Sequence, residues 1–97
     1  EFGKWENFKR DMVRDHGDGK YIIYGEMQLD EFNAFFELNI SSNNSDTIGG
    51  YIIEKLSSIP EKGDLITIEN LELKIKSVIK RTIKTIEVKI IPNKRND

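Results

Sequence analysis

Two stretches near the end of the chain alternate between apolar and charged residues. Residues 71–76 read LELKIK and residues 86–90 read IEVKI. Successive side chains of a β-strand point to opposite faces of its sheet, so each stretch predicts a strand with one buried and one solvated face. The alternation loses its phase at Ser77, Val78 and Ile79, which predicts a β-bulge or the end of strand pairing there. A sheet of this kind needs a second layer on one side.

The remaining segments supply further strands and that second layer. Residues 21–24 (YIIY) and 65–68 (LITI) are β-rich runs next to turn residues, and both predict strands. Apolar residues at helical spacing predict one helix over about residues 28–38 and a second over about residues 46–59. The predicted order is β-α-α-β-β-β. This gives an α+β fold in which two helices pack on a mostly antiparallel sheet.

The first predicted helix has a wide aromatic face and an acidic first turn. Phe32, Phe35 and Phe36 lie at helical spacing, so they are interpreted as core residues rather than as a stacking platform for a flat ligand. Asp30 and Glu31 fall in the first turn, where negative charge favours the helix dipole. Their position is therefore explained without a catalytic role.

The second predicted helix contains an unusual pair of glycines, Gly49 and Gly50, close to its N-terminus. Each glycine costs a helix about 1 kcal/mol relative to alanine, so the pair needs a reason. Backbone amides at a helix start can bind a phosphate, and small residues also allow close packing against another backbone. The pattern matches neither G-x-G-x-x-G nor a P-loop, which favours packing. Ser45 or Asp46 is the expected N-cap, and Pro60 is expected to end the helix.

Composition excludes several classes of function. The chain has 97 residues, 15 basic and 17 acidic residues, a net charge of −2 and no cysteine. The charge balance gives no footprint for a nucleic acid, and thiolate metal sites and cysteine nucleophiles are excluded. Asp15, His16 and Asp18 form a His-carboxylate group on a Gly-rich turn, but they are too few for a metal site. The sequence contains no recognised catalytic motif, so neither catalytic nor metal-binding residues are predicted.

Two ordered sets of motifs resemble the CorC/HlyC transporter-associated domain. Residues 18–25 (DGKYIIYG) followed by 29–33 (LDEFN) resemble the opening of that family, a strand between glycines followed by L-x-E-L-N. Residues 47–52 (TIGGYI) followed by 59–64 (IPEKGD) resemble its centre, T-x-x-G and then I-P-x-x-G-D. With the final hairpin, the resemblance covers about residues 18–91. It places the transporter-associated domain at 18–92, with a linker or short helix of a longer parent chain at 1–17 and a polar tail at 93–97.

The resemblance implies a function for the parent protein. Domains of this family lie at the C-terminus of bacterial CBS-containing membrane proteins that are called hemolysin-like or linked to magnesium and cobalt efflux. This implies a non-catalytic accessory or regulatory domain on the cytoplasmic side of the plasma membrane, itself soluble. Its expected partners are the CBS pair and the transmembrane domain of its own protein. A homodimer formed by pairing of strand edges is a further option.

The resemblance also implies an alternative function. The family fold is similar to part of PCMH-type FAD-binding domains, so the domain is alternatively a sensor that binds FAD or an adenine nucleotide. In that case Gly49 and Gly50 are the candidate cofactor-binding residues. The sequence offers no flavin motif of its own.

Overall fold

The computed structural model describes residues 13–17 and 19–91 of the chain. Within this part, strands and helices follow one another in the order β1 (Val13–Gly17), β2 (Lys20–Tyr24), α2 (Leu29–Phe36), α3 (Ile48–Leu56), β3 (Leu65–Ile68), β4 (Leu71–Ile79) and β5 (Thr82–Ile90).

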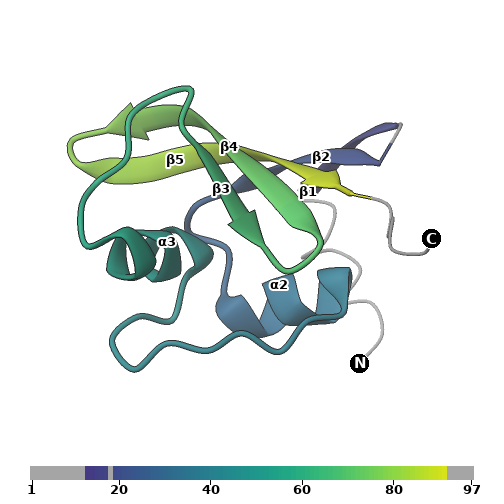
Figure 1. Cartoon of the computed structure of the whole chain (residues 1–97), viewed down its shortest axis with the longest axis horizontal. Helices are drawn as coiled ribbons and strands as arrows, with labels where there is room; N and C mark the ends of the chain where they lie inside the picture. Colours follow the sequence, from purple (N-terminus) through teal and green to yellow (C-terminus); the bar gives the residue numbers. More distant parts are fainter. Residues whose placement is uncertain (1–12, 18, 92–97) are drawn as a thin grey trace.

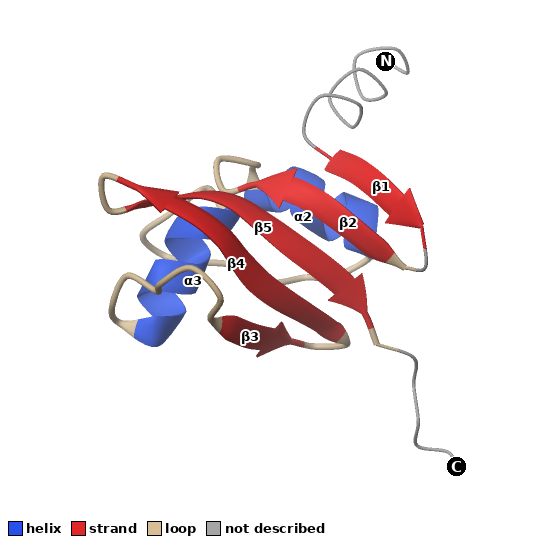
Figure 2. Ribbon diagram, turned by 90° about the horizontal axis from the view of Figure 1, so that it is seen from above, coloured by secondary structure: helices blue, strands red, loops and turns tan. Residues whose placement is uncertain are grey.

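The strands form one antiparallel sheet in the order β1-β2-β5-β4-β3. Both helices lie on the same side of this sheet (Figure 1). Seen from above, α2 lies behind β2, and α3 lies nearer the hairpin of β4 and β5 (Figure 2). The predicted α+β architecture of two helices on an antiparallel sheet is therefore confirmed. The last strand, β5, is the central strand of the sheet and pairs with β2, which comes from near the other end of the described chain.

The first strand corrects one expectation. Residues 1–17 were expected to be a linker or a short helix, but Val13–Gly17 forms β1, which pairs with β2 from Val13↔Ile23 to Gly17↔Lys20. The helical spacing behind the expectation came from residues 5, 8 and 12, which lie outside the described residues. The turn before β2 contains Gly19 at a φ of 75°, a conformation that favours glycine. The domain boundaries at 18 and 92 stay a prediction, and the tail at 93–97 lies outside the described residues.

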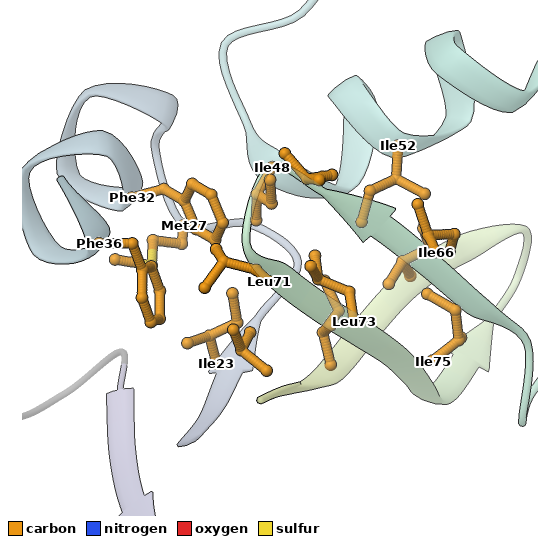
Figure 3. Packing of buried hydrophobic residues seen from close by; sticks show 14 of the residues in the cluster. Ile23, Met27, Phe32, Phe36, Ile48, Ile52, Ile66, Leu71, Leu73 and Ile75 are labelled. Atoms are coloured by element: carbon orange, nitrogen blue, oxygen red, sulfur yellow. The ribbon is translucent and has the colours of Figure 1, made fainter. Parts of the chain in front are cut away.

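The core lies between the sheet and the helices. Leu71, Leu73 and Ile75 of β4 alternate with solvated residues and are at most 1% exposed, as the sequence pattern predicts. Ile86 and Val88 of β5 are fully buried beside them. Figure 3 shows that side chains from both helices and from the loop before α2 meet this layer: Met27, Phe32, Phe36, Ile48 and Ile52.

Helix α2 contributes its aromatic face to this core. Phe32 is fully buried and Phe36 is 9% exposed, so the core interpretation of these rings is confirmed. Phe35 and Phe36 meet the ring of Tyr21 edge-on, with centroid distances of 5.3 and 5.6 Å. This edge-to-face geometry is favourable for aromatic rings and ties the helix to β2. Glu37 ends the helix in the left-handed conformation, at a φ of 59°.

Helix α3 ends earlier than expected. Its last residue is Leu56, and Ser57 follows in the left-handed conformation at a φ of 62°, with its N–H donating to the carbonyl of Ile53. The helix is thus closed by a local turn three residues before Pro60, which the sequence analysis took as its end. Pro60 is buried instead.

The predicted irregularity in β4 is a β-bulge. The register with β5 shifts between Ile75 and Ser77 and again between Ser77 and Val78, while the pairing continues to Ile79↔Thr82. At the bulge, the hydroxyl groups of Ser77 and Thr85 lie 2.6 Å apart and form a hydrogen bond. A bulge bends its strand and raises the local twist, so the β4–β5 hairpin is bent at this point.

The alternation of β4 leads to a stability prediction. Ile75 is fully buried opposite Ile86, and its neighbour Lys74 is exposed opposite Glu87. We expect Ile75→Ala to lower the free energy of unfolding by about 2–5 kcal/mol, because it leaves a cavity in the core. Lys74→Ala is the matched control and should cost less than about 1 kcal/mol. Urea unfolding followed by circular dichroism measures both, and equal losses would contradict the assigned faces of β4.

Candidate functional site

A concave site lies where β2 ends, α3 begins and the β4–β5 hairpin turns. It is a pocket of about 480 Å³. Apolar side chains from all three segments line it: Tyr24, Ile53 and Ile83. Threonines contribute polar groups: Thr47, Thr82 and Thr85. The backbone of Gly25, Gly49 and Gly50 lines the rest, so the predicted glycine pair lies in this pocket.

Gly25 and Gly49 bring two backbones into direct contact. The N–H of Gly49 donates to the carbonyl of Gly25 at 2.8 Å, and a Cβ on Gly49 would lie 2.9 Å from that same oxygen. The N–H of Gly25 donates in turn to the carbonyl of Lys84 at 2.9 Å, and a Cβ on Gly25 would overlap the carbonyl of Ile83. Gly49 therefore serves close packing of the helix start against the end of β2, which confirms the packing interpretation for this residue.

Gly50 is confined by the loop before the helix. A Cβ at this position would overlap the hydroxyl of Ser45 and come within 2.7 Å of the Ser45 Cβ. The N–H of Gly50 donates to the side-chain hydroxyl of Thr47 at 3.1 Å, so Thr47 is the N-cap. This corrects the expectation that Ser45 or Asp46 caps the helix. The Asp46 carbonyl instead accepts from the N–H of Leu29 at 2.7 Å.

The amides at the start of α3 all have acceptors within the protein. The N–H of Ile48 donates to Met27 at 2.9 Å, Gly49 donates to Gly25, Gly50 to the Thr47 hydroxyl, and Tyr51 to the Thr47 carbonyl at 2.9 Å. A phosphate cradle requires amides that point to free space. Any anion in this pocket therefore depends on side chains rather than on these amides.

Two basic side chains at the pocket carry the positive charge that an anion would need. Arg81 and Lys84 line the pocket from the β4–β5 hairpin, and the acidic residue Glu26 lines it from the turn after β2. All three side chains are exposed. The turn of this hairpin consists of Lys80 and Arg81, because Ile79 pairs with Thr82.

The other candidate residues do not assemble into a site. Asp15 and His16 fall in β1, while Asp18 lies outside the described residues. Within residues 13–17 and 19–91, no three His, Cys, Asp or Glu side chains lie close enough together to hold a metal ion. Asp30 and Glu31 are in the first turn of α2, as expected for a favourable helix dipole. Neither helix of the described residues has the length and apolar character that crossing a membrane requires.

Comparison with known proteins places the chain in a family. The model of the transporter-associated domain, CorC_HlyC, matches residues 14–92. A magnesium and cobalt efflux protein CorC from Buchnera aphidicola is 34% identical over 82 residues, which cover 84% of this chain and 28% of that protein. The chain spans 14% to 28% of the length of the curated relatives that it matches.

Solved structures agree with this assignment. A hemolysin domain from Enterococcus faecalis is 26% identical with a TM-score of 0.76, covering 84% of this chain and 99% of that domain. A transporter-associated domain from a CBS domain protein of Porphyromonas gingivalis shares the fold at 22% identity and a TM-score of 0.70, covering 82% of this chain and 98% of that one. The chain belongs to the CorC/HlyC transporter-associated domain family.

The two glycines of α3 lead to a second prediction. We expect Gly49→Ala to lower the free energy of unfolding by about 1–3 kcal/mol despite the better helix propensity of alanine, because the new Cβ meets backbone that cannot rotate away. Gly50→Ala should also destabilise, since it meets Ser45. In a Ser45→Gly background only the contact of the new Cβ with the Thr47 hydroxyl, at 3.2 Å, remains, so Gly50→Ala should cost less than it does in the wild type.

Thermal and urea unfolding of the four variants, Gly49→Ala, Gly50→Ala, Ser45→Gly and the Ser45→Gly/Gly50→Ala pair, measures these effects. The Ser45→Gly variant alone is the control for the loss of its own hydrogen bonds. A stabilising Gly49→Ala, or the same cost of Gly50→Ala in both backgrounds, would contradict the packing roles assigned here.

Proposed function

We propose that this domain is a non-catalytic accessory and regulatory part of a larger bacterial membrane protein of the CorC type, in which it modulates the transport of divalent cations such as magnesium and cobalt. The observation that carries the proposal is family membership, together with a relative that is named as a magnesium and cobalt efflux protein. In this proposal the domain lies on the cytoplasmic side and contacts the CBS pair and the transmembrane domain of its own protein.

The physical character of the described residues supports a role through contacts. They contain no group of metal-ligating side chains from which an ion would be passed on. The face of the sheet away from the helices is charged and carries exposed lysines and half-buried glutamates. Two of these residues, Lys76 and Glu87, form an ion pair in which the Lys76 Nζ lies 3.5 Å from a carboxylate oxygen of Glu87. A folded module of this kind affects transport only if its contacts differ between the states of the transporter.

A transport measurement tests this role. We expect removal of the domain from the full-length parent protein, reconstituted in vesicles, to change the magnesium concentration at half-maximal transport by at least about fivefold, the lower end of typical coupling between sites. Ile75→Ala in the full-length protein should shift the magnesium concentration at half-maximal transport in the same direction, because it destabilises the domain without deleting sequence. Ile75→Val, which removes only one methylene from the core, should change transport much less than Ile75→Ala does. Unchanged magnesium and cobalt transport after removal of the domain would contradict the proposal.

A second candidate function is a sensor that binds FAD or an adenine nucleotide. The observation that favours it is the pocket beside Gly49 and Gly50, whose volume of about 480 Å³ lies within the usual range of small-molecule sites. Arg81 and Lys84 supply positive charge for a phosphate group at its edge. In this candidate the glycine pair shapes the pocket, and the phosphate contacts come from the hairpin.

Titration of the 97-residue domain into FAD tests the sensor candidate. If the domain is a sensor, flavin fluorescence should change saturably at micromolar protein, and ATP should reverse the change if the adenine part is recognised. Denatured domain is the control for nonspecific quenching. No saturable change with FAD, and no shift of amide resonances with ATP, would exclude the sensor and leave the contact-based role unaffected.

A further inference from the structure

The turn between β4 and β5 has an uncommon composition for its geometry. Ile79 pairs with Thr82, so the hairpin loop consists of only Lys80 and Arg81, with φ angles of 52° and 64°. Two-residue loops with positive φ at both positions favour Asn-Gly or Asp-Gly, because other side chains are strained there. Strain that is retained at a few positions is a marker of functional sites. The hairpin thus keeps two cations where uncharged turn residues would be more stable.

The strained turn lies at the edge of the pocket. Arg81 of the turn and Lys84 of β5 line it together with the apolar side chains of Tyr24, Ile53 and Ile83. Within the described residues, neither Arg81 nor Lys84 forms an ion pair, so both cations are available to a ligand. A two-residue turn also restricts where its side chains lie, which lowers the entropy lost when Arg81 binds an oxyanion.

Backbone forms part of the wall of the pocket. Gly25 and Gly49 carry no side chains: a Cβ on Gly25 would overlap the carbonyl of Ile83, and a Cβ on Gly49 would lie 2.9 Å from the carbonyl oxygen of Gly25. The pocket is therefore bounded by apolar walls and backbone, with cations at one edge and Glu26 as the opposing charge. Arginine recognises carboxylate and phosphate groups through paired hydrogen bonds, whereas apolar walls bind a flat apolar group.

We propose that this pocket binds a small organic anion, made of a flat apolar body and a carboxylate or phosphate group, and that Arg81 and Lys84 hold the anionic end. The proposal does not depend on the transport role. It shares the hairpin cations with the sensor candidate and goes beyond that candidate because its ligands include carboxylates as well as phosphates and need not be nucleotides.

The test uses phenyl phosphate and benzoate as probes of the two anionic groups, with benzyl alcohol as the uncharged analogue. Amide resonances of the ¹⁵N-labelled domain are followed during each titration. We expect saturable shifts centred on Gly25, Gly50, Ile53 and Ile83 with one or both anions, and binding at least about tenfold weaker, equal to about 1.4 kcal/mol, for benzyl alcohol. Shifts that centre on another surface, or equal binding of benzyl alcohol, would overturn the proposal.

Variants of the hairpin separate binding from folding. The double variant Lys80→Asn/Arg81→Gly introduces the favoured turn sequence, so its unfolding temperature should be equal or higher while anion binding falls at least about tenfold. Lys84→Gln removes the second cation without touching the turn and should also weaken binding. Lys89→Gln, on another exposed part of β5, is the matched control and should bind as the wild type does. Unchanged binding in both hairpin variants would overturn the assignment.

Comparing the titrations with simple anions and with nucleotides distinguishes the possible kinds of ligand. Binding of phenyl phosphate or benzoate without binding of FAD or ATP supports the proposal and excludes the nucleotide sensor. Binding of all of them identifies nucleotides as members of the ligand class. Absence of binding by both simple anions at millimolar concentration overturns the proposal, and the transport measurement on the full-length protein is unaffected by that result.

Discussion

The backbone of Gly25 contacts two other segments at once, and the arrangement of both layers depends on this contact. Its carbonyl accepts from the N–H of Gly49 at the start of α3, and its own N–H donates to the carbonyl of Lys84 in β5. A side chain on Gly25 or on Gly49 would overlap backbone atoms, which cannot rotate away as a side chain can. The distance between α3 and the sheet is therefore set by hydrogen-bonded backbone rather than by the size of core side chains.

The same contact links segments that are distant in the sequence. β2 pairs with β5 across more than half of the chain, and α2, α3, β3 and β4 are formed by the residues between them. Contacts of such long sequence separation lose chain entropy before they gain stability. The local pairing of β4 with β5 offsets part of this cost, because the hairpin presents one apolar face to the helices and the edge of β5 to β2.

Much of this fold is predictable from the sequence because single segments carry the information. The alternation of β4 and β5, the bulge at Ser77, the aromatic face of α2 and the packing role of Gly49 all follow from local patterns. The pairing of β1 was missed, because the pattern that was read lies before Val13 and a strand partner is not visible in a local pattern. The end of α3 at Ser57 was missed because a left-handed serine closes the helix before Pro60 does.

The pocket was not predictable in the same way. It is formed by residues 24–26, by residues 47–53 and by residues 81–85, which meet only in the folded molecule. Gly49 and Gly50 were singled out for a phosphate, but the amides at the start of α3 are bonded to Met27, Gly25 and Thr47. The charge that a phosphate would need lies instead on Arg81, in the hairpin turn, and on Lys84, near the start of β5, about thirty residues from the glycine pair in the sequence.

The proposed regulatory role and the proposed ligand pocket are connected by an energetic requirement. A ligand shifts an equilibrium between two transporter states only by the difference in its affinity for them, and a tenfold difference corresponds to about 1.4 kcal/mol. Here the pocket is bounded by α3, by the end of β2 and by the β4–β5 hairpin, which share the hydrogen bonds of Gly25. A neighbouring domain that moves any one of these three segments also changes the shape of the pocket. Occupancy of the pocket and contact with a neighbouring domain are then coupled through backbone that has little freedom to adjust.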